Sequence, residues 1–486
     1  MRCAAGWLAG AGRTRANHRT LRAVTDIVAE TAVHPLPNGE VRLLGAVSAV
    51  TGAMTLVELH SAGGASGAGG ARRHRVLVDC GVAQGREARH WSLPDDAHRV
   101  DAIVLTHAHN DHVGSLPDVI ERGYDGPIFG TRATLAIARI VLEDGLSLDR
   151  TPNRDRQRIM ARFAALARPV PYGKAGAWID GLDAQFAMHE AGHILGSASL
   201  ELTTPQSRIV VSGDLGRPDS PILRDYNTTW SSAQPLDLVV MESTYGDHDH
   251  AQSHDDVAAE LERIVNRAMT LRGHILVPAF AIGRTQTLLW HLNALIEAGR
   301  IRNLPVAIDT PMGLQVTETY DRFRDLFDRE AVDRIAWGDD PLDFDGLYAV
   351  RRGKDSERLR DVEGPMLVIA GSGMCTGGRI MGHLRELLPL DRTTVLFVGF
   401  QAPGTTGRAI QQASRSTRTG EMGSVRIDGE YVDVRAHIET LSGLSAHADR
   451  GELARWLGAL PTPRRVALHH GEPDAQHALV SWLRAH

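Results

Sequence analysis

Cysteine is scarce in this chain, whose 486 residues include only Cys3, Cys80 and Cys375. Three scattered thiols are too few for a disulfide framework or a thiolate zinc cluster, so we expect a protein of a reducing, cytoplasmic compartment. Long apolar runs are missing as well: the longest charge-free stretch, residues 43–57, is interrupted by hydroxyl residues. A membrane-spanning helix needs roughly 20 apolar residues, so we predict neither a transmembrane segment nor a membrane partner.

Neither sign of charge dominates, because 53 Lys and Arg face 59 Asp and Glu and give a formal net charge of −6. A nucleic-acid partner would therefore have to be held by a local patch or by metal ions. The length predicts two or three domains, at about 150 residues each. Histidine, with 23 residues, is the most suggestive part of the composition, because imidazole is a common metal ligand and acid–base group.

The first 38 residues are rich in arginine, and no acidic residue precedes Asp26. A mitochondrial or chloroplast transit peptide fits this composition, whereas a secretory signal fits it weakly because the apolar stretch before Arg13 is short. A disordered extension or an upstream start codon also explains the segment, and we favour this pair of interpretations. We therefore treat residues 1–38 as a disordered N-terminal extension.

Alternating strand and helix patterns predict an α/β architecture. Apolar segments with strand character occupy residues 41–52, 54–59, 75–81, 102–109, 208–214 and 237–244. Helical periodicity appears at residues 131–144 and 256–272. The Gly/Ala/Ser-rich residues 61–71 are typical of a hairpin-loop insertion between two strands.

The sequence THAHNDHVG places four candidate metal ligands, His107, His109, Asp111 and His112, at the end of a short apolar strand. Alternation along an extended segment would point His107, His109 and Asp111 the same way, while His112 turns toward a neighbouring point. Such an arrangement suits two adjacent metal ions. A surface cluster of polar residues would rarely have this spacing.

This motif resembles the signature of the metallo-β-lactamase superfamily, and LVDCG, AGHILGS and VVSGDLG follow the other motifs of that superfamily. The resemblance implies a four-layer αββα fold. It also implies one Zn²⁺ ion held by His107, His109 and His193, a second held by Asp111 and His112, and Asp214 as the bridge between them. Mn²⁺ is an open alternative to zinc. Asp79 would be a supporting carboxylate that orients ligand histidines.

The long insertion between Asp214 and His447 resembles the β-CASP domain of RNA- and DNA-processing nucleases, in the group of the cleavage and polyadenylation specificity factor endonuclease and ribonuclease J. The resemblance rests on MESTYG, GGRIMGHL and LSAHAD, together with VPAFAIGRTQTLL, GSGMCTGGR and GFQAPGTTGR. It implies an α/β insert at residues 246–382, between metallo-β-lactamase segments at 39–245 and 383–486. VALHHGE departs from the pattern, because His469 doubles the usual histidine.

Residue roles follow from the same resemblance. His383 would act at the scissile phosphate, Glu242 would position or polarise it, and His447 would complete the shell of the second metal, next to Asp111. Glycine-rich segments allow close approach of a phosphate, and arginine can bind it through two hydrogen bonds. We therefore predict a looser substrate-binding set of Ser372, Arg379, Gly404 and Arg408, although glycine-rich turns are as often structural.

These observations predict a zinc-dependent ribonuclease that acts on single-stranded RNA by a two-metal hydroxide mechanism. Two alternatives stay open: a metallo-β-lactamase-fold hydrolase of a small ester or thioester, and a non-catalytic RNA-binding scaffold. The sequence does not decide between endonuclease and 5′ exonuclease action or between RNA and DNA. A homodimer is suggested by analogy alone.

Overall fold

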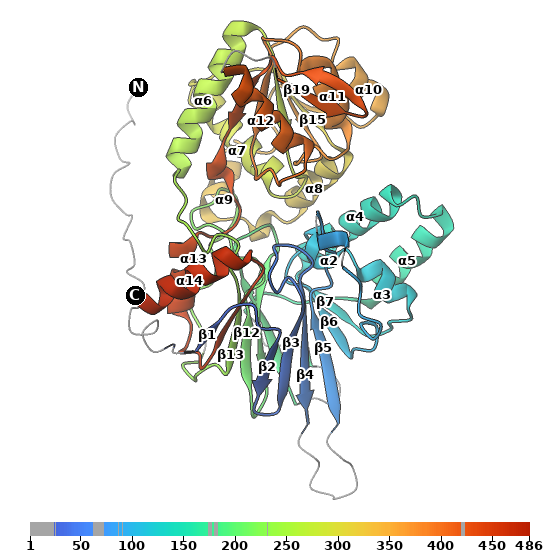
Figure 1. Ribbon diagram of the computed structural model, residues 1–486, viewed down its shortest axis with the longest axis vertical. Helices are drawn as coiled ribbons and strands as arrows, with labels where there is room; N and C mark the ends of the chain where they lie inside the picture. Colours follow the sequence, from blue (N-terminus) through green and yellow to red (C-terminus); the bar gives the residue numbers. More distant parts are fainter. Residues whose placement is uncertain are drawn as a thin grey trace, which may run out of the picture.

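A computed structural model describes residues 24, 26–61, 72–85, 87–89, 91–173, 177–178, 183–230, 232–418 and 423–486. The chain forms two stacked units (Figure 1). The lower unit combines residues 26–242 with residues 446–486 and holds two seven-stranded sheets. The upper unit, residues 254–441, is built on one six-stranded sheet. Residues 243–253 and 442–445 connect the two units.

The two sheets of the lower unit are built from both parts of the chain. The first sheet has the order β2 (Val33–Leu36), β3 (Gly39–Gly45), β4 (Met54–His60), β5 (Arg73–Val78), β6 (Ala102–Val104), β7 (Ile128–Gly130) and β8 (Ala167–Pro169). The second has the order β1 (Ile27–Val28), β22 (Val466–His469), β13 (Leu238–Glu242), β12 (Arg208–Val211), β11 (Ala198–Thr203), β10 (Gln185–Glu190) and β9 (Ala177–Trp178). β22 lies between β1 and β13, so the end of the lower unit completes a sheet that the beginning started.

Side chains along these strands point alternately to the two faces of each sheet, so the two sheets can pack face to face. Val57 and Val76 of the first sheet pack with Phe186 and Leu200 of the second in one buried core. The alternate residues of each strand face outward and pack against helices, which cover the outer faces of both sheets. Those helices are α2 (Asn110–Val113), α3 (Leu116–Glu121), α4 (Arg132–Leu148) and α5 (Asn153–Leu166) on the first sheet, and α13 (Arg450–Ala459) and α14 (Pro473–Ala485) on the second. The predicted four-layer αββα arrangement is confirmed.

The sheet of the upper unit is entirely parallel and has helices on both faces. Its order is β16 (Leu347–Ala349), β15 (Val306–Asp309), β17 (Met366–Ala370), β14 (His274–Pro278), β18 (Thr394–Phe397) and β21 (His437–Thr440). One face packs on α6 (His254–Leu271), α7 (Arg284–Glu297), α8 (Pro311–Arg322) and α9 (Arg329–Ala336). The other packs on α11 (Arg379–Leu387), α12 (Thr406–Arg418) and the hairpin β19 (Ser424–Ile427) and β20 (Glu430–Asp433). Short α10 (Gly353–Arg358) precedes β17.

Local sequence signals begin several of these helices. Ser253 and Asp256 form a capping box at α6, which satisfies two free backbone N–H groups. Asp449 and Glu452 do the same at α13. The Thr131 side chain accepts a hydrogen bond from the backbone N–H of Thr134 at the start of α4.

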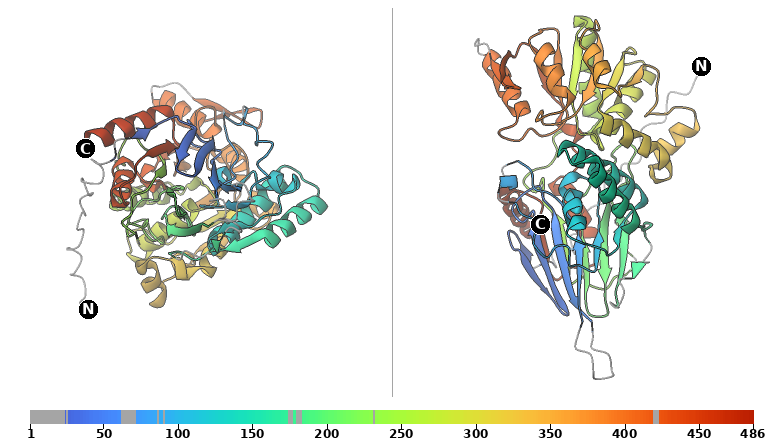
Figure 2. Two further views of the ribbon diagram at one scale, coloured as in Figure 1. Left: turned by 90° about the horizontal axis from the view of Figure 1, so that it is seen from below. Right: turned by 90° about the vertical axis from the view of Figure 1, so that its right-hand side faces the viewer.

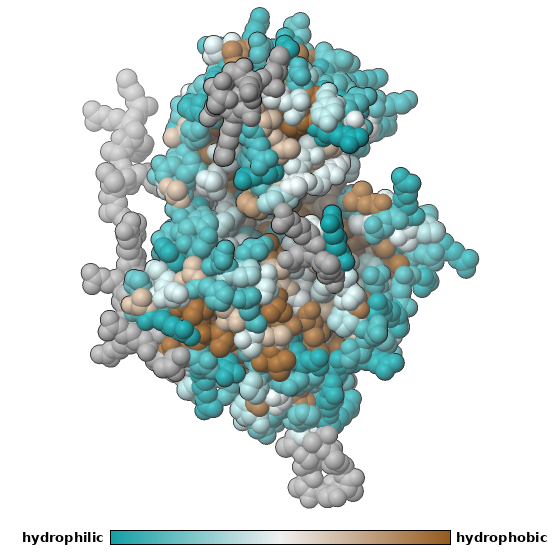
Figure 3. Space-filling model, viewed as in Figure 1, coloured by the Kyte–Doolittle hydropathy of each residue, from teal (hydrophilic) through white to brown (hydrophobic). Residues whose placement is uncertain are grey.

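The two units share a continuous apolar core rather than a thin hinge. α4 of the lower unit packs on α8 of the upper unit (Figure 2). The buried Tyr320 hydroxyl on α8 accepts a hydrogen bond from the Leu195 backbone N–H, beside β10. On the face seen in Figure 3, hydrophilic side chains cover most of the upper unit, whereas hydrophobic residues gather across the middle of the lower unit. The relative position of the two units is thus fixed by buried contacts.

Two of the predicted boundaries differ from the structure. The insert was expected to end at residue 382, but β18 pairs with β14 and β21 pairs with β18, so the upper unit extends to residue 441. The N-terminal extension was expected to reach residue 38, but β1 and β2 already belong to the sheets of the lower unit. Residues 1–23, which carry most of the predicted extension, lie outside the described residues, as do residues 62–71 of the hairpin tip.

The predicted strand pairing around that tip is present, because β4 and β5 pair antiparallel over their whole length.

Cys80 and Cys375 are both buried free thiols, and Cys3 lies outside the described residues. In the described part of the chain, none of the helices combines the length and the apolar character that crossing a membrane requires.

Candidate metal centre and active site

The predicted metal ligands meet where the strands of the lower unit end, on the side that faces the upper unit. His107 and His109 follow β6, His193 follows β10, and Asp214 follows β12. The strand predicted at residues 102–109 is wrong in length, because β6 ends at Val104 and residues 110–113 form α2. Strand alternation therefore does not orient Asp111, which lies in the first turn of α2.

Asp214 lies at the centre of the cluster and is 2% exposed. Its Oδ2 atom is 3.4 Å from His107 Nε2 and 3.6 Å from His193 Nε2. Its Oδ1 atom is 3.3 Å from His112 Nε2 and 3.4 Å from His470 Nδ1. Gly213 makes this position accessible, because its φ is 58° and a Cβ there would lie 2.7 Å from Thr106 Cβ. Each carboxylate oxygen thus faces a different group of histidines.

The first group consists of His107, His109 and His193. His109 Nδ1 lies 3.1 Å from His107 Nε2 and 3.2 Å from His193 Nε2. The His193 ring is held from behind, since its Nδ1–H donates to the Ala446 carbonyl at 3.1 Å. Together with Asp214, these ligand atoms all lie within 4.8 Å of one another.

The second group consists of Asp111, His112 and His470. His470 Nε2 is 3.3 Å from His112 Nε2 and 3.6 Å from Asp111 Oδ2. His470 was missed at the sequence level, where His447 was expected to complete this group. The available signal was the histidine pair directly after the apolar strand VAL, in which His469 occupies the last strand position and His470 the first position beyond it.

Asp79 orients the second group, as the sequence suggested. His112 Nδ1–H donates to Asp79 Oδ2 at 2.8 Å, which leaves His112 Nε2 free to face Asp214. The backbone N–H and the hydroxyl of Thr106 donate to the same carboxylate at 2.8 and 2.7 Å. A carboxylate behind a ligand histidine fixes its tautomer and orientation.

The first histidine group and Asp214 have the protonation states that a cation site needs. Burial lowers the pKa of His107 and His193 well below the usual value and that of His109 to about 4. These rings are therefore neutral at pH 7, the form that binds metals. Burial would raise the pKa of Asp214, but His470, His112 and His107 outweigh burial and lower it, so the carboxylate is charged.

The donor set fits a divalent cation. Asp214 Oδ1 is buried and has no hydrogen-bond partner in the described part of the chain, a costly state unless a cation satisfies it. Clustered imidazoles and carboxylates are the usual ligands of zinc and related ions. The residues present therefore suit one ion at each histidine group.

A second feature of the centre is the pair formed by His447 and Glu242. His447 Nδ1 lies 3.2 Å from Glu242 Oε1 and 3.9 Å from Asp214 Oδ2. Glu242 is fully buried at the end of β13, where its Oε1 atom accepts from the Leu215 backbone N–H at 2.6 Å. The His447 side chain is 19% exposed. His447 is thus paired with Glu242 rather than placed with Asp111 and His112.

The predicted role of His383 at the scissile phosphate is wrong. This ring is fully buried on α11, where its Nε2–H donates to Asp309 Oδ2 at 2.6 Å. Burial would raise the pKa of Asp309, but hydrogen bonds from His383, Ser356 and Arg379 outweigh burial and lower it. A fully buried histidine bound to a charged carboxylate cannot contact RNA, so His383 is a structural residue of the upper unit.

Arg379 belongs to the same structural network. Its guanidinium donates to Asp309 Oδ1 at 2.7 Å and to the carbonyls of Val350 and Arg351 at 2.8 and 2.9 Å. The predicted contact with substrate phosphate is not supported, because these protein groups already engage its donors. Arg379 instead joins α11 to the end of β16.

The other predicted substrate residues lie in loops at the carboxyl ends of the upper strands. The Ser372 hydroxyl accepts from the Thr376 backbone N–H at 2.9 Å and so closes the loop after β17. Gly404 is exposed in the loop after β18, and Arg408 follows in the first turn of α12. Within the described part of the chain no carboxylate pairs with the Arg408 guanidinium, so these two positions remain open to a ligand.

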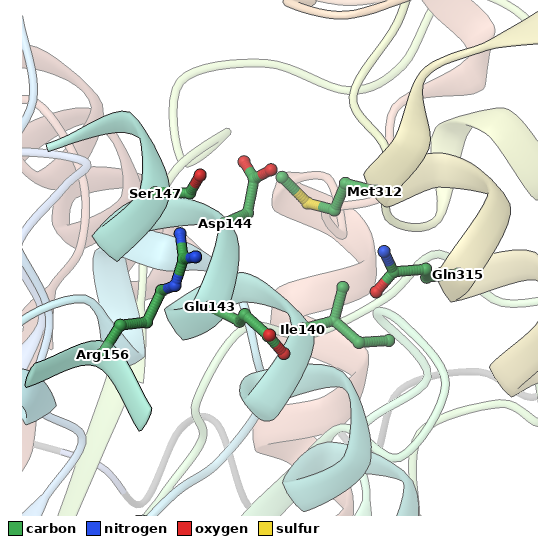
Figure 4. Close-up of a pocket in the computed structure, with 7 residues that line it drawn as sticks. All are labelled: Ile140, Glu143, Asp144, Ser147, Arg156, Met312 and Gln315. Carbon is green, nitrogen blue, oxygen red and sulfur yellow. The ribbon is translucent and has the colours of Figure 1, made fainter. Parts of the chain in front are cut away.

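Two hollows lie between the units. The first adjoins the metal centre and is lined by His193, Gly283, Arg284 and Ser445, among others. The second is remote from every predicted site residue and lies between α4, α5 and α8 (Figure 4). It is lined by Ile140, Glu143, Asp144, Ser147, Arg156, Met312 and Gln315. Its two carboxylates disfavour a polyanion, so the first hollow is the better candidate for an active site.

Comparison with known proteins identifies the family. Three family models match: the metallo-β-lactamase superfamily at residues 71–279, the Beta-Casp domain at 285–410 and the Zn-dependent metallo-hydrolase RNA specificity domain at 431–486. The protein named ribonuclease TTHA0252 from Thermus thermophilus is 38% identical over 412 residues, which cover 84% of this chain and 90% of that relative. The chain belongs to the β-CASP family of the metallo-β-lactamase superfamily. The resemblance seen in the sequence motifs is confirmed.

Further relatives of this β-CASP chain are archaeal proteins named transcription termination factor FttA. The protein from Methanocaldococcus jannaschii is 29% identical over 414 residues, and that from Methanothermobacter thermautotrophicus is 31% identical over 417 residues. Both alignments cover 82% of this chain but 63% of the relative, so the chain spans less than two thirds of their length. Membership of the superfamily implies divalent metal binding, which the clustered histidines and aspartates fit.

His470, and not His447, lies with Asp111 and His112, so the alanine variants of these two histidines should differ in metal content. His470→Ala removes a donor from the group of Asp111 and His112, so we expect the protein to lose one of two bound ions. His447→Ala should retain both, because the His447 ring pairs with Glu242 and stands outside the two histidine groups. Metal per chain, measured by inductively coupled plasma mass spectrometry after gel filtration, tests this. Loss of an ion in His447→Ala with full content in His470→Ala would reverse the assignment.

The Asp309 network predicts a structural defect. Asp309→Ala leaves the buried His383 ring and the Arg379 guanidinium without their carboxylate, and breaking such a buried pair costs about 3–5 kcal/mol. We expect a loss of about 3 kcal/mol in the free energy of unfolding, measured in urea. Asp333→Ala, which breaks the exposed pair with Arg329, is the control and should cost about 0.5 kcal/mol or less. Equal stability of both variants would refute the structural role.

Proposed function

We propose that this β-CASP protein is a zinc-dependent ribonuclease that hydrolyses phosphodiester bonds of single-stranded RNA with two metal ions. The observation that carries the proposal is the central Asp214 carboxylate, whose two oxygens face two separate histidine groups. The printed names of the Thermus relative and of the matching RNA specificity domain support RNA as the substrate. A scaffold role is disfavoured because the full donor set is present.

The residues that would hold the ions follow from the two groups. His107, His109 and His193 would hold one ion, and Asp111, His112 and His470 the other, with Asp214 shared between them. Imidazole-rich ligand sets completed by carboxylates favour Zn²⁺. Two bound ions would supply a nucleophile near neutral pH and neutralise charge on the phosphodiester.

His447 is placed to protonate the leaving oxygen. Its Nδ1 atom faces the buried Glu242 carboxylate, which leaves Nε2 free of that contact on a side chain that is 19% exposed. Burial lowers the pKa of His447, but the charge of Glu242 and the hydrogen bond to it outweigh burial and raise the pKa above its usual value. The raised pKa favours the protonated ring, the form that a general acid needs.

Glu242 acts through His447 rather than on RNA. Its carboxylate is fully buried and is fixed by the backbone N–H groups of Leu215 and Thr244. This fixed charge orients the His447 ring and favours its protonated form. Glu242 is thus a positioning residue in this mechanism.

Cleavage of a 5′-labelled single-stranded RNA tests the function. The metal-loaded protein should shorten the RNA, and chelator should abolish cleavage. His447→Ala should lower kcat about 10²- to 10⁴-fold, the usual contribution of a general acid, while metal content stays unchanged. Arg329→Ala, an exposed site on α9, is the control for nonspecific effects. Full metal content without RNA cleavage would refute the proposal.

The pH dependence of the reaction tests the Glu242–His447 pair. Because His447 must donate a proton, kcat should fall as pH rises through its raised pKa. Glu242→Gln removes the charge that raises this pKa, so the descending limb should move to lower pH. Single-turnover rates between pH 5.5 and 9.5 at saturating metal would measure this shift. Identical descending limbs in both proteins would exclude His447 as the acid that Glu242 tunes.

A further inference from the structure

Two aromatic rings are exposed at the edge of the upper unit that faces the lower unit. Phe280 follows β14 and is 38% exposed, and Phe400 follows β18 and is 65% exposed. Both lie at the carboxyl ends of parallel strands, where open α/β sheets bind their ligands. Two exposed aromatic rings at such an edge make it a candidate binding surface.

Phe280 is held as a rigid platform. A Cβ atom at Gly373 would lie 2.9 Å from the ring, and one at Gly399 would lie 3.6 Å from it, so bare backbone supports the ring. The buried Gln401 side chain holds these two glycines together, since its Nε2 donates to the Gly373 carbonyl at 2.9 Å and to the Gly399 carbonyl at 3.1 Å. Phe400 stands directly between Gly399 and Gln401 in the same loop.

The charge of this edge suits a polyanion. The four loops that form it, residues 279–284, 371–379, 398–408 and 441–446, contain no aspartate or glutamate, although the whole chain has 59. The same loops carry Arg284 and Arg408. Arg284 Nη1 donates to the Val398 carbonyl at 3.4 Å, which places its guanidinium beside the Phe400 loop. Loops with cations and no anions attract phosphate groups.

The loop of Phe280 also reaches the metal centre. A Cβ atom at Gly283 would lie 3.1 Å from the Ile194 side chain, next to His193. Gly283 and His193 line the same hollow. A strand whose phosphate lies at the metal centre therefore has its neighbouring nucleotides within reach of the edge that carries Phe280.

We propose that Phe280 and Phe400 form a stacking platform for the bases of single-stranded RNA, with Arg408 at a phosphate of the same strand. This inference rests on the proposed ribonuclease function and adds how the substrate is held. Every base has a π face, so a stacking platform accepts all sequences but requires unpaired bases. The platform thus selects single strands without reading their sequence.

Binding to RNA with and without bases tests the platform. We would measure fluorescence anisotropy of a labelled oligouridylate and of an abasic ribose-phosphate oligomer of equal length and charge, with chelator present so that the strands stay intact. Phe400→Ala should weaken binding of the oligouridylate about tenfold and leave binding of the abasic oligomer unchanged. Phe400→Trp, which keeps an aromatic face, should bind the oligouridylate as the unsubstituted protein does.

The control is Tyr431→Ala, which removes an even more exposed aromatic ring from the β19–β20 hairpin and should change neither affinity. Equal loss on both oligomers, or no loss in Phe400→Ala, would overturn the platform even if the protein cleaves RNA. Base-dependent binding that requires Phe400 would support the platform even in a protein that fails to cleave, in which case the ribonuclease proposal alone would fall. Arg408→Gln should weaken binding of both oligomers and flatten its salt dependence; an unchanged salt dependence would remove Arg408 from the strand's path.

Discussion

The buried Asp214 carboxylate is the constraint on which the lower unit depends. A charge in such a position is costly unless several partners surround it, and here those partners come from β6, β10, β22 and α2. Both seven-stranded sheets must therefore end at the same point, and both parts of the chain must contribute. The sandwich core and its helices fix the positions of the strand ends. The strand ends in turn fix the positions of the candidate metal ligands.

Much of the fold was readable from local patterns. Apolar strand segments and the helical periods at residues 131–144 and 256–272 mark real elements, because burial of one face imposes its period on the sequence. The extent of the upper unit was not readable, because β18 joins β14, and β21 joins β18, across long stretches of chain. The hydrophobic pattern of a strand in such a parallel pair does not indicate which sheet the strand belongs to.

The site was predictable where residue type and spacing alone define the chemistry, as in His107, His109 and His112. The prediction of residue roles was wrong where a role depends on residues that are distant in the sequence. His447 and His470 both follow motif-like segments, and only the register of β22 beside β13 places His470 by Asp111. His383 also lies in a motif-like segment, but it is on the buried face of α11, where it is hydrogen-bonded to Asp309.

The order of the chain has a consequence for synthesis. β22 and His470 follow the entire upper unit in sequence, yet β22 completes a sheet that begins at Ile27, and His470 completes a ligand group that begins at Asp111. Because a growing chain folds from its N-terminus, the ribosome must translate the upper unit before the last ligand exists. Under the proposed function, an unfinished chain that lacks His470 cannot assemble its complete nucleolytic centre.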